Sequence, residues 1–486
     1  MVNRRDFLKS SAAAGAALSL GGRRLFGQEA ATKPNFILFM CDQMRQPRWF
    51  PATAELPNFS RLKERGLEFT RHFASAVPCS PSRACLFTGL HSAQNGVIEN
   101  VLPEFQEDLN PQIPMLGQLF RKAGYQTHYF GKWHLSRKKQ MKKQGGLEAY
   151  GFEYHSTDTA GPGLTTDPGC AAAACDWLLD PNNHNQPWFL VVSLINPHDI
   201  CGYNTLHIPE VFIDDEITSL PANFTDDLTG KPRCHAEYRD LTMPKDMAAG
   251  KENLWLNYIN YYYFLMRKMD NLLGKVLDTL DSAAQTGNTV FIFTSDHGEM
   301  GGAHRLAFKG PFIYDENTNI PLVISWPGKI QPLTQTNALC QNVDLFPTLA
   351  ALLGFDPKME FPYLPGHSLF PVLLEPKTAA VNYHLLFSFA ENVAMVKKRE
   401  LAGEPWIQSP HQIRSIRERN WAYARYFDPE SSDQDFELYD LFNDPYMMKN
   451  LAHDRDYRAT RQEMAEKLFI AESSEMAPMD LAKMKI

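Results

Sequence analysis

The chain has few cysteines for its 486 residues and no long run of basic residues. Eight cysteines are too sparse for a disulfide framework in a chain of this size, and their spacing contains no paired zinc-binding cluster. The formal net charge is −8, and the longest basic stretch is the short segment 137–143. We therefore expect no nucleic-acid-binding surface.

The chain also lacks long apolar runs. After the N-terminal segment, none approaches the roughly 20 residues that a membrane-spanning helix requires, so no transmembrane segment is expected in the mature chain. Hydrophobic residues make up 44% of the sequence and charged residues 21%, which is typical of a folded protein and excludes a disordered or collagen-like chain. We expect a large packed core.

The N-terminus has the pattern of an export signal. Arg4 and Arg5 are followed by Lys9 and by a weakly apolar stretch of small residues at 10–20. This arrangement resembles a twin-arginine signal, which the Tat machinery recognises. We therefore expect residues 1–30 to direct export, and the mature protein to be periplasmic or extracellular.

Three short apolar runs, at 35–41, 188–195 and 289–295, end in polar residues. Each is typical of a strand that is buried on both faces. Helical patterns lie between and after them, at 57–66, 82–91, 117–124, 255–284 and 343–354. This alternation predicts an α/β fold with a mostly parallel sheet sandwiched by helices.

Four reactive residues fall where these strands end: Asp42, His198, Asp296 and His297. Because ligands of such sheets bind beyond the carboxyl ends of the strands, we expect these side chains to share a site.

The pattern changes after about residue 370. Short segments at 412–417 and 421–427 precede a final amphipathic helix, which predicts a smaller α+β subdomain with an antiparallel sheet. Residues 200–250 and 355–412 are rich in Pro, Gly, Asn and Asp, and we interpret them as long surface loops that shape a cleft.

The strongest motif runs from Val77 to Gly89 (VPCSPSRACLFTG). The helix predicted at 82–91 places Cys79 just ahead of its N-terminus, where the helix dipole favours an anion and a nucleophile. Arg83 lies one helical turn further on and can return to the same site. A buried structural cysteine would explain neither this arginine nor the neighbouring prolines.

This motif resembles the C-x-P-S-R signature, with its following T-G, of the type I sulfatases in the alkaline phosphatase superfamily. The resemblance implies an alkaline-phosphatase-like fold and a hydrolase that releases inorganic sulfate from a sulfate ester. It also implies that a maturation enzyme oxidises Cys79 to formylglycine, whose hydrate attacks sulfur. Because the resemblance covers nearly all of the mature chain, we expect a catalytic domain at 31–370 and a C-terminal subdomain at 371–486.

Two further segments resemble the metal-binding segments of this family. Asp42 fits the first aspartate of the usual pair, whereas Gln43 replaces the second and offers an uncharged amide oxygen. Asp296 and His297 match the second segment. Together with Cys79 they imply an oxygen-rich site for a hard cation, for which Ca²⁺ is expected ahead of Mg²⁺.

The remaining catalytic residues are also implied by the resemblance. Lys132 and His134 match the family segment G-K-W-H, in which the lysine binds sulfate and the histidine acts as the base that expels sulfate. His198 matches the histidine that protonates the leaving group, and Lys309 matches a second sulfate-binding lysine. Arg83 is expected to hold an oxygen of the hydrated formylglycine.

Two alternative functions are left open. A phosphonate monoester or phosphodiester hydrolase shares the nucleophile motif and a glutamine at the position of Gln43, but lacks the pair that Lys132 and His134 supply. A non-catalytic binder of sulfated glycans would be expected to have lost a catalytic residue, and none is lost.

The substrate is the least determined property. Export and long loops favour a sulfated carbohydrate, while small aryl or choline esters remain open. His304 and Arg305 are candidate substrate contacts.

Overall fold

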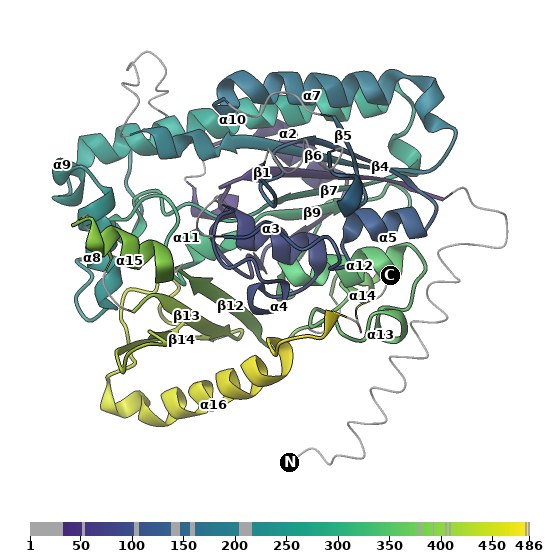
Figure 1. Cartoon of the computed structure of the whole chain (residues 1–486). Coiled ribbons are helices and arrows are strands. Elements are labelled where there is room, and N and C mark those ends of the chain that lie inside the picture. Colours follow the sequence, from purple (N-terminus) through teal and green to yellow (C-terminus); the bar gives the residue numbers. More distant parts are fainter. Residues whose placement is uncertain are drawn as a thin grey trace.

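A mostly parallel sheet of eight strands forms the centre of the computed structural model (Figure 1), in the order β10-β2-β9-β7-β1-β6-β4-β5. The structure describes residues 33–50, 54–101, 106–137, 146–155, 161–203, 216–377, 381–391, 393–403, 406–407, 410–481 and 484. The predicted signal at 1–30 lies outside them. The strands are β1 Asn35–Asp42, β2 Leu67–Phe69, β4 Gln126–Gly131, β5 Glu153–His155, β6 Trp188–Pro197, β7 Thr289–Ser295, β9 Leu322–Ser325 and β10 Thr334–Thr336.

The central strand β1 supplies two hydrophobic cores. Its even-numbered residues from Phe36 to Met40 enter one core, and its odd-numbered residues from Ile37 to Cys41 enter the other. All are fully buried, which explains the continuous apolar run in the sequence.

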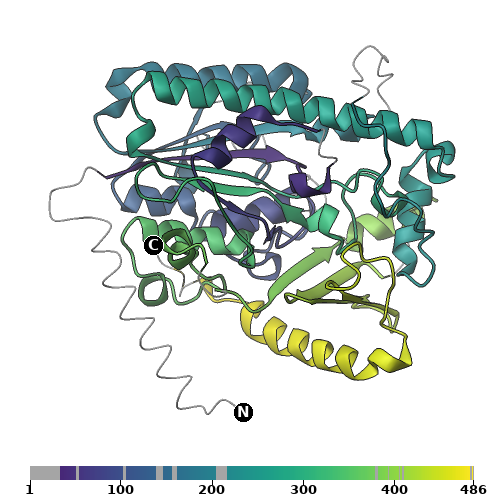
Figure 2. The ribbon, with the colours of Figure 1, turned by 180° about the vertical axis from the view of Figure 1, so that it is seen from behind.

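Helices cover both faces of this sheet (Figures 1 and 2). On one face lie α2 Pro57–Glu64, α7 Gly163–Leu179 and α10 Glu252–Ser282. On the other lie α3 Cys79–Thr88, α5 Leu116–Lys122 and α12 Leu345–Leu352. This arrangement confirms the predicted α/β sandwich.

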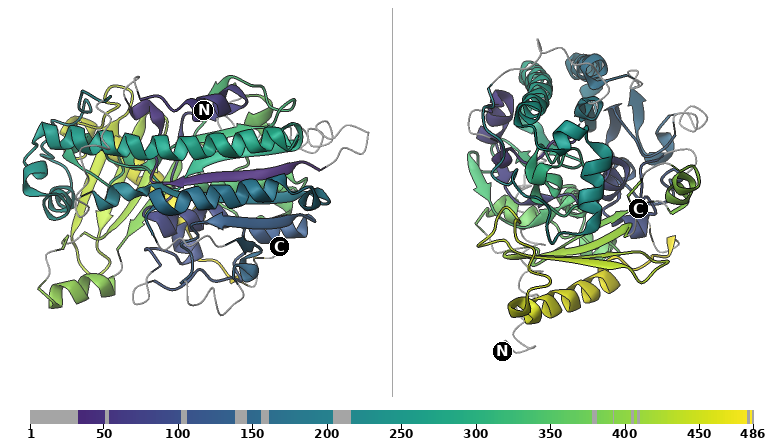
Figure 3. Two further views of the ribbon diagram at one scale, coloured as in Figure 1. Left: turned by 90° about the horizontal axis from the view of Figure 1, so that it is seen from above. Right: turned by 90° about the vertical axis from the view of Figure 1, so that its left-hand side faces the viewer.

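A second, antiparallel sheet lies towards the C-terminus, as predicted. Its strands follow one another as β12 Leu385–Ala390, β13 Gln412–Arg417, β14 Trp421–Phe427 and β15 Gln434–Asp440. Helix α16, Arg458–Glu475, covers one face of this sheet through Met464 and Leu468 (Figure 3). The opposite face packs on the loops that follow β7. A small three-stranded sheet combines β11 Cys340–Gln341, β3 His72–Phe73 and β8 Asn319–Ile320.

The interpretation of residues 200–250 and 355–412 as loops was partly wrong. They contain α8 Arg233–Thr242, α9 Lys245–Ala248, α13 Pro357–Glu360, α14 Phe370–Leu374, α15 Val393–Leu401 and strand β12. Pro232 and Pro244 directly precede α8 and α9, so these prolines mark helix starts. Two other short helices are α4 Ser92–Asn95 and α11 Asp315–Thr318.

All eight cysteines are free thiols. Within the described residues, no helix has both the length and the apolar character needed to cross a bilayer.

Candidate active site

Two parallel neighbouring strands deliver the acidic residues of the site. β1 ends at Asp42, and Asp296 follows β7 directly. Because Cys41 pairs with Ser295, both aspartates leave the sheet at the same level. The backbone N–H of Gln43 donates to Asp296 Oδ1 at 3.0 Å and ties the two strand ends together.

Cys79 lies against these carboxylates. Helix α3 begins at Cys79 itself, three residues earlier than predicted, so the cysteine occupies the first turn. Its Sγ lies 3.2 Å from His297 Nε2 and 3.6 Å from Asp42 Oδ1. The ligand atoms of Asp42, Cys79, Asp296 and His297 all lie within 4.8 Å of one another, and all four residues are buried. We call these four residues the central cluster.

Arg83 holds the two carboxylates in place. Its Nε donates to Asp296 Oδ2 at 2.8 Å, and its Nη2 donates to Asp42 Oδ2 at 3.0 Å. Its Nη1 donates to the Lys132 carbonyl and to Ser193 Oγ, at 2.8 and 2.9 Å. These contacts place the guanidinium beside the aspartates as a positioning group.

Lys132 reaches the cluster from the end of β4. Its Nζ lies 2.6 Å from Asp42 Oδ2 and 3.9 Å from Cys79 Sγ. The preceding Gly131 has φ +97°, and a Cβ there would lie 2.1 Å from the Ser193 carbonyl oxygen. Only glycine fits this close approach between β4 and β6, which accounts for the glycine of the G-K-W-H segment.

Two histidines complete the surroundings of Cys79. His134 has φ 60°, an uncommon backbone conformation for a residue other than glycine, and its Nδ1 is buried without a partner in the described part of the chain. His198 follows β6 at the start of a short 3₁₀ turn. Burial, together with nearby Lys132, lowers the pKa of both histidines, that of His198 to about 4, while a hydrogen bond to Cys79 opposes the shift in each.

Lys309 contacts Gln43, which lies beside the central cluster, and makes no hydrogen bond to a described residue of the cluster itself. Its Nζ donates to Gln43 Oε1 at 2.6 Å and to Cys201 Sγ at 3.3 Å. Gln43 Nε2 donates in turn to Glu299 Oε2 at 2.6 Å. The amide oxygen expected to face a metal ion therefore faces Lys309 in this structure.

Burial and neighbouring charges shift the pKa values of Asp296, His297 and Cys79. Burial and Asp42 raise the pKa of Asp296 to about 6. Burial alone would lower the pKa of His297, but Asp296 and Cys79 raise it to about 9. Burial opposes ionisation of Cys79, yet Lys132, together with other nearby positive charges, holds the pKa of its thiol well below the usual value.

The two candidate substrate contacts lie elsewhere. His304 is fully buried, with Nδ1 2.6 Å from Asp226 Oδ2 and its ring stacked on Tyr314 at 3.8 Å. The Arg305 guanidinium lies over Phe224 at 5.7 Å. The described residues give neither of them a contact with the central cluster, and His304 has no exposed surface to offer a substrate.

Three positioning residues were not predicted: Ser193, Cys201 and Glu299. Ser193 is the only polar side chain in the apolar run of β6, and Glu299 stands two residues after His297, so both had a signal in the sequence. Cys201 had no such signal, because its contact with Lys309 Nζ depends on the turn after β6 that brings the two residues together.

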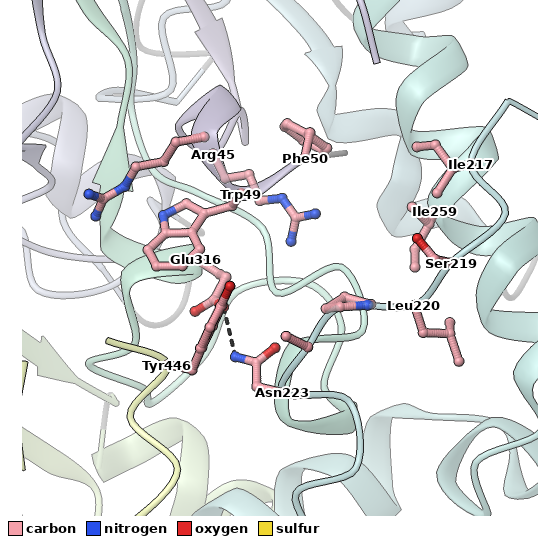
Figure 4. A pocket seen from close by; sticks show the side chains of 13 residues that line it. Arg45, Trp49, Phe50, Ile217, Ser219, Leu220, Asn223, Ile259, Glu316 and Tyr446 are labelled. Atoms are coloured by element: carbon pink, nitrogen blue, oxygen red, sulfur yellow. Dashed lines mark hydrogen bonds between the residues drawn. The ribbon is translucent and has the colours of Figure 1, made fainter. Parts of the chain in front are cut away.

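A separate hollow of about 210 Å³ lies near α10, lined among others by Trp49, Leu220 and Tyr446 (Figure 4). Within its lining Asn223 Nδ2 donates to Glu316 Oε1 at 2.8 Å, while Arg45 Nε and Trp49 Nε1 are buried without a partner in the described part of the chain. No residue of the central cluster lines it.

A sheet covered by helices on both faces, with buried carboxylates and a nucleophile at its carboxyl edge, is the arrangement expected of a hydrolase of the alkaline phosphatase superfamily. The Sulfatase family model matches residues 34–355, and the model described as N-sulphoglucosamine sulphohydrolase, C-terminal, matches 302–474. The chain belongs to the sulfatase family and is a sulfatase.

Curated relatives and solved structures agree with this assignment. The chain is 28% identical to a Delta 4,5-hexuronate-2-O-sulfatase of Bacteroides thetaiotaomicron, over 88% of this chain and 86% of the relative. It is 25% identical to an ulvan-active sulfatase of Formosa agariphila, over 91% and 81%. The structure of a 2-O GAG sulfatase matches with a TM-score of 0.74 and 25% identity, covering 91% of this chain and 92% of that one.

The fold alone does not separate the two enzyme alternatives. The structure of a phosphonate monoester hydrolase of Agrobacterium radiobacter matches with a TM-score of 0.69 and 25% identity, over 91% of this chain and 96% of that one. The family models assign the chain to the sulfatases.

A model of the twin-arginine translocation signal matches residues 1–21, so the protein is exported.

Proposed function

We propose that this sulfatase hydrolyses the sulfate ester of a carbohydrate, with Cys79 matured to formylglycine as its nucleophile. The observation that carries the proposal is the convergence of a fully buried cysteine, two carboxylates and an imidazole at the end of the sheet. Lys132 supplies a cation 3.9 Å from Cys79 Sγ, where a sulfate would bind. We further propose a signal at 1–30, a catalytic domain at 31–370 and a C-terminal subdomain at 371–486.

The central cluster fits a divalent cation. Two buried carboxylates this close repel each other, as the raised pKa of Asp296 indicates, because burial and Asp42 both disfavour its charge. Asp42, Asp296 and His297 would hold the ion, and their oxygen-rich donor set favours Ca²⁺ over Mg²⁺ and over zinc. When bound, the ion and the hydrated aldehyde supply charge neutralisation and the attacking oxygen.

Two lysines are proposed to bind the sulfuryl oxygens. Burial alone would lower the pKa of Lys132, but Asp42 and Cys79 raise it. Burial likewise opposes the charge on Lys309, and Cys201 and Cys79 raise its pKa above the usual value. Both side chains are therefore ammonium ions at neutral pH and can stabilise negative charge that builds up on the sulfuryl group.

The two histidines are proposed to move protons. His198 is neutral in the free enzyme, because burial, Lys132 and Lys309 lower its pKa to about 4. A bound sulfate neutralises the two lysines and raises that pKa, so His198 becomes a proton donor to the leaving alkoxide when substrate is present. His134, neutral because its own pKa is lowered by burial, is available as the base that expels sulfate.

The carbohydrate class is supported by the relatives. Among the similar curated proteins, one acts on an unsaturated hexuronate, one on ulvan, and a third is named N-acetylglucosamine-6-O-sulfatase. A choline-sulfatase of Rhizobium meliloti, at 25% identity, represents the small-ester alternative.

The test is inorganic sulfate release from a substrate panel. It contains 2-O- and 6-O-sulfated oligosaccharides, ulvan fragments, choline sulfate, an aryl sulfate and a phosphonate monoester. The enzyme is co-produced with a formylglycine-generating enzyme, the maturation partner that the proposal requires. We expect kcat/KM to be highest for one sulfated sugar; a preference for choline sulfate or the phosphonate ester would overturn the carbohydrate assignment.

The matched control is Cys85→Ser. Cys85 lies on the same helix and is equally buried, but its Sγ faces Ser92 Oγ at 3.6 Å, away from the central cluster. Cys79→Ser is expected to lose turnover while Cys85→Ser retains it. Equal losses in both variants would show that helix α3 responds to any cysteine substitution, and would contradict the role of Cys79.

A further inference from the structure

A second group of metal-binding side chains lies at the open edge of the main sheet. β5 is the edge strand and pairs in parallel with β4, so that His128 lies opposite Glu153, and Phe130 opposite His155. His128 Nδ1 and His155 Nε2 share a hydrogen bond of 2.9 Å. Glu153 Oε2 lies 3.7 Å from His128 Nδ1, and Glu153 Oε1 lies 3.7 Å from His155 Nε2. None of these residues belongs to the central cluster.

Neighbouring rings hold both imidazoles in position. The His128 ring packs against Trp177 with centroids 4.7 Å apart. The His155 ring stacks on Phe130 at 4.5 Å, with only 10° between the two planes. The two rings are therefore fixed side by side, and the 2.9 Å contact between their nitrogens is a hydrogen bond. One of the two nitrogens carries the proton of that bond, which must move to the other nitrogen of its ring before both can bind an ion.

The protonation and exposure of the group also suit a metal ion. Burial lowers the pKa of both histidines, that of His128 to about 4, so both rings are neutral at neutral pH and each has one unprotonated nitrogen. The Glu153 side chain is 59% exposed, which leaves a path for an ion and room for water ligands. His128 Nε2 is buried without a partner in the described part of the chain, so binding will be weaker than at a closed structural zinc site.

We propose that His128, Glu153 and His155 bind a divalent transition-metal ion that fastens β5 to β4. Two imidazole nitrogens and one carboxylate favour a borderline metal over the Ca²⁺ expected at the central cluster. Cu²⁺, Ni²⁺ and Zn²⁺ all bind imidazole nitrogen well, and Cu²⁺ binds most strongly of the three.

The ion would act on a strand that leads into the active site. β4 continues directly into Lys132 and His134, while β5 has no partner on its outer side in the described sheet. Fastening the edge strand would therefore stabilise the strand that carries these two residues.

The experiment uses Cu²⁺ as the probe. Mature, folded protein is kept in excess Ca²⁺, Cu²⁺ is added up to one equivalent, and electron paramagnetic resonance counts the nitrogen ligands. We expect one saturable Cu²⁺ with two nitrogen ligands, and a rise in Tm on binding. His155→Asn should remove one nitrogen from the spectrum, and Glu153→Gln, at an exposed position, should weaken binding without altering the fold.

Two control variants locate the ion. His184→Ala removes another half-buried histidine that packs against Trp177 but lies outside the group, and it should leave the spectrum unchanged. His297→Asn removes the imidazole of the central cluster and should also retain the two-nitrogen signal. Loss of the signal in His297→Asn, its persistence in His155→Asn, or no saturable binding to the wild type would each overturn the proposal.

Discussion

Replacing Glu299 with glutamine tests how the site holds Gln43 and Lys309. One oxygen of Glu299 accepts from Tyr258 Oη at 2.8 Å and from the backbone N–H of Gly301 and Phe308 at 3.0 and 2.7 Å. The other oxygen accepts from Gln43 Nε2 at 2.6 Å. Since Phe308 directly precedes Lys309, this one carboxylate positions both the lysine and the amide that it binds.

The Glu299→Gln variant cannot satisfy all of these donors. If its amide oxygen keeps the first three, its NH₂ group faces the NH₂ group of Gln43. If Gln43 turns its amide to relieve this, its NH₂ group then faces the Lys309 ammonium. One buried donor is left unpaired in either case, at a cost of about 1–3 kcal/mol.

The assay compares kcat, KM and Tm on the best sulfated substrate. A cost of about 1–3 kcal/mol corresponds to about a 5- to 150-fold loss of kcat/KM. The reciprocal exchange, Glu299→Gln with Gln43→Glu, restores an acceptor for both the new amide and Lys309, so it should recover much of the activity that either single substitution loses. A Glu299→Gln variant with unchanged kcat/KM, or a double variant no better than the singles, would refute the positioning role.

Three other outcomes follow from the same geometry. His134→Ala should lower kcat and KM together and leave kcat/KM little changed, because the residue is proposed to expel sulfate after the ester has been cleaved; equal burst and steady-state rates would contradict this. Removing divalent ions with a chelator should abolish sulfate release and lower Tm, since the buried pair of Asp42 and Asp296 loses its countercharge, and Ca²⁺ should restore both. Burial alone would raise the pKa of Asp226, but its hydrogen bond with His304 lowers it to about 2, below the ordinary value of 3.8. The interaction between the Asp226 carboxylate and His304 therefore stabilises the folded protein above about pH 4, and this stabilisation is lost as the pH falls towards 2. His304→Ala should therefore unfold at a higher pH in an acid titration and lose about 1–3 kcal/mol of stability at neutral pH, with kcat unchanged.

The strands that carry the site were predictable from the sequence. β1, β6 and β7 are fully buried, so their apolar runs stand out, and the polar residues at their ends mark the site. Strand β4 was not predicted, because its segment Gln126–Gly131 mixes polar and aromatic residues. Helix α7 was also missed, since its sequence contains Pro168 and a run of alanines without a clear apolar stripe.

The side-chain directions at the site could not be derived from the motifs. The spacing placed Arg83 near Cys79, but its contacts with both aspartates depend on how α3 meets the sheet. Gln43 was expected to face a metal ion, whereas Glu299 turns its amide oxygen towards Lys309. Such orientations depend on residues distant in the sequence, which no local pattern contains.

The mass of the tryptic peptide 72–83, which contains Cys79, shows whether the nucleophile is formylglycine. It should be taken from the same preparation in which sulfate release is assayed, with the protein purified from its native host. We expect the mass of the formylglycine form, and a turnover that rises in proportion to the modified fraction. Full sulfatase activity in a preparation whose peptide carries only the unmodified thiol would contradict this expectation.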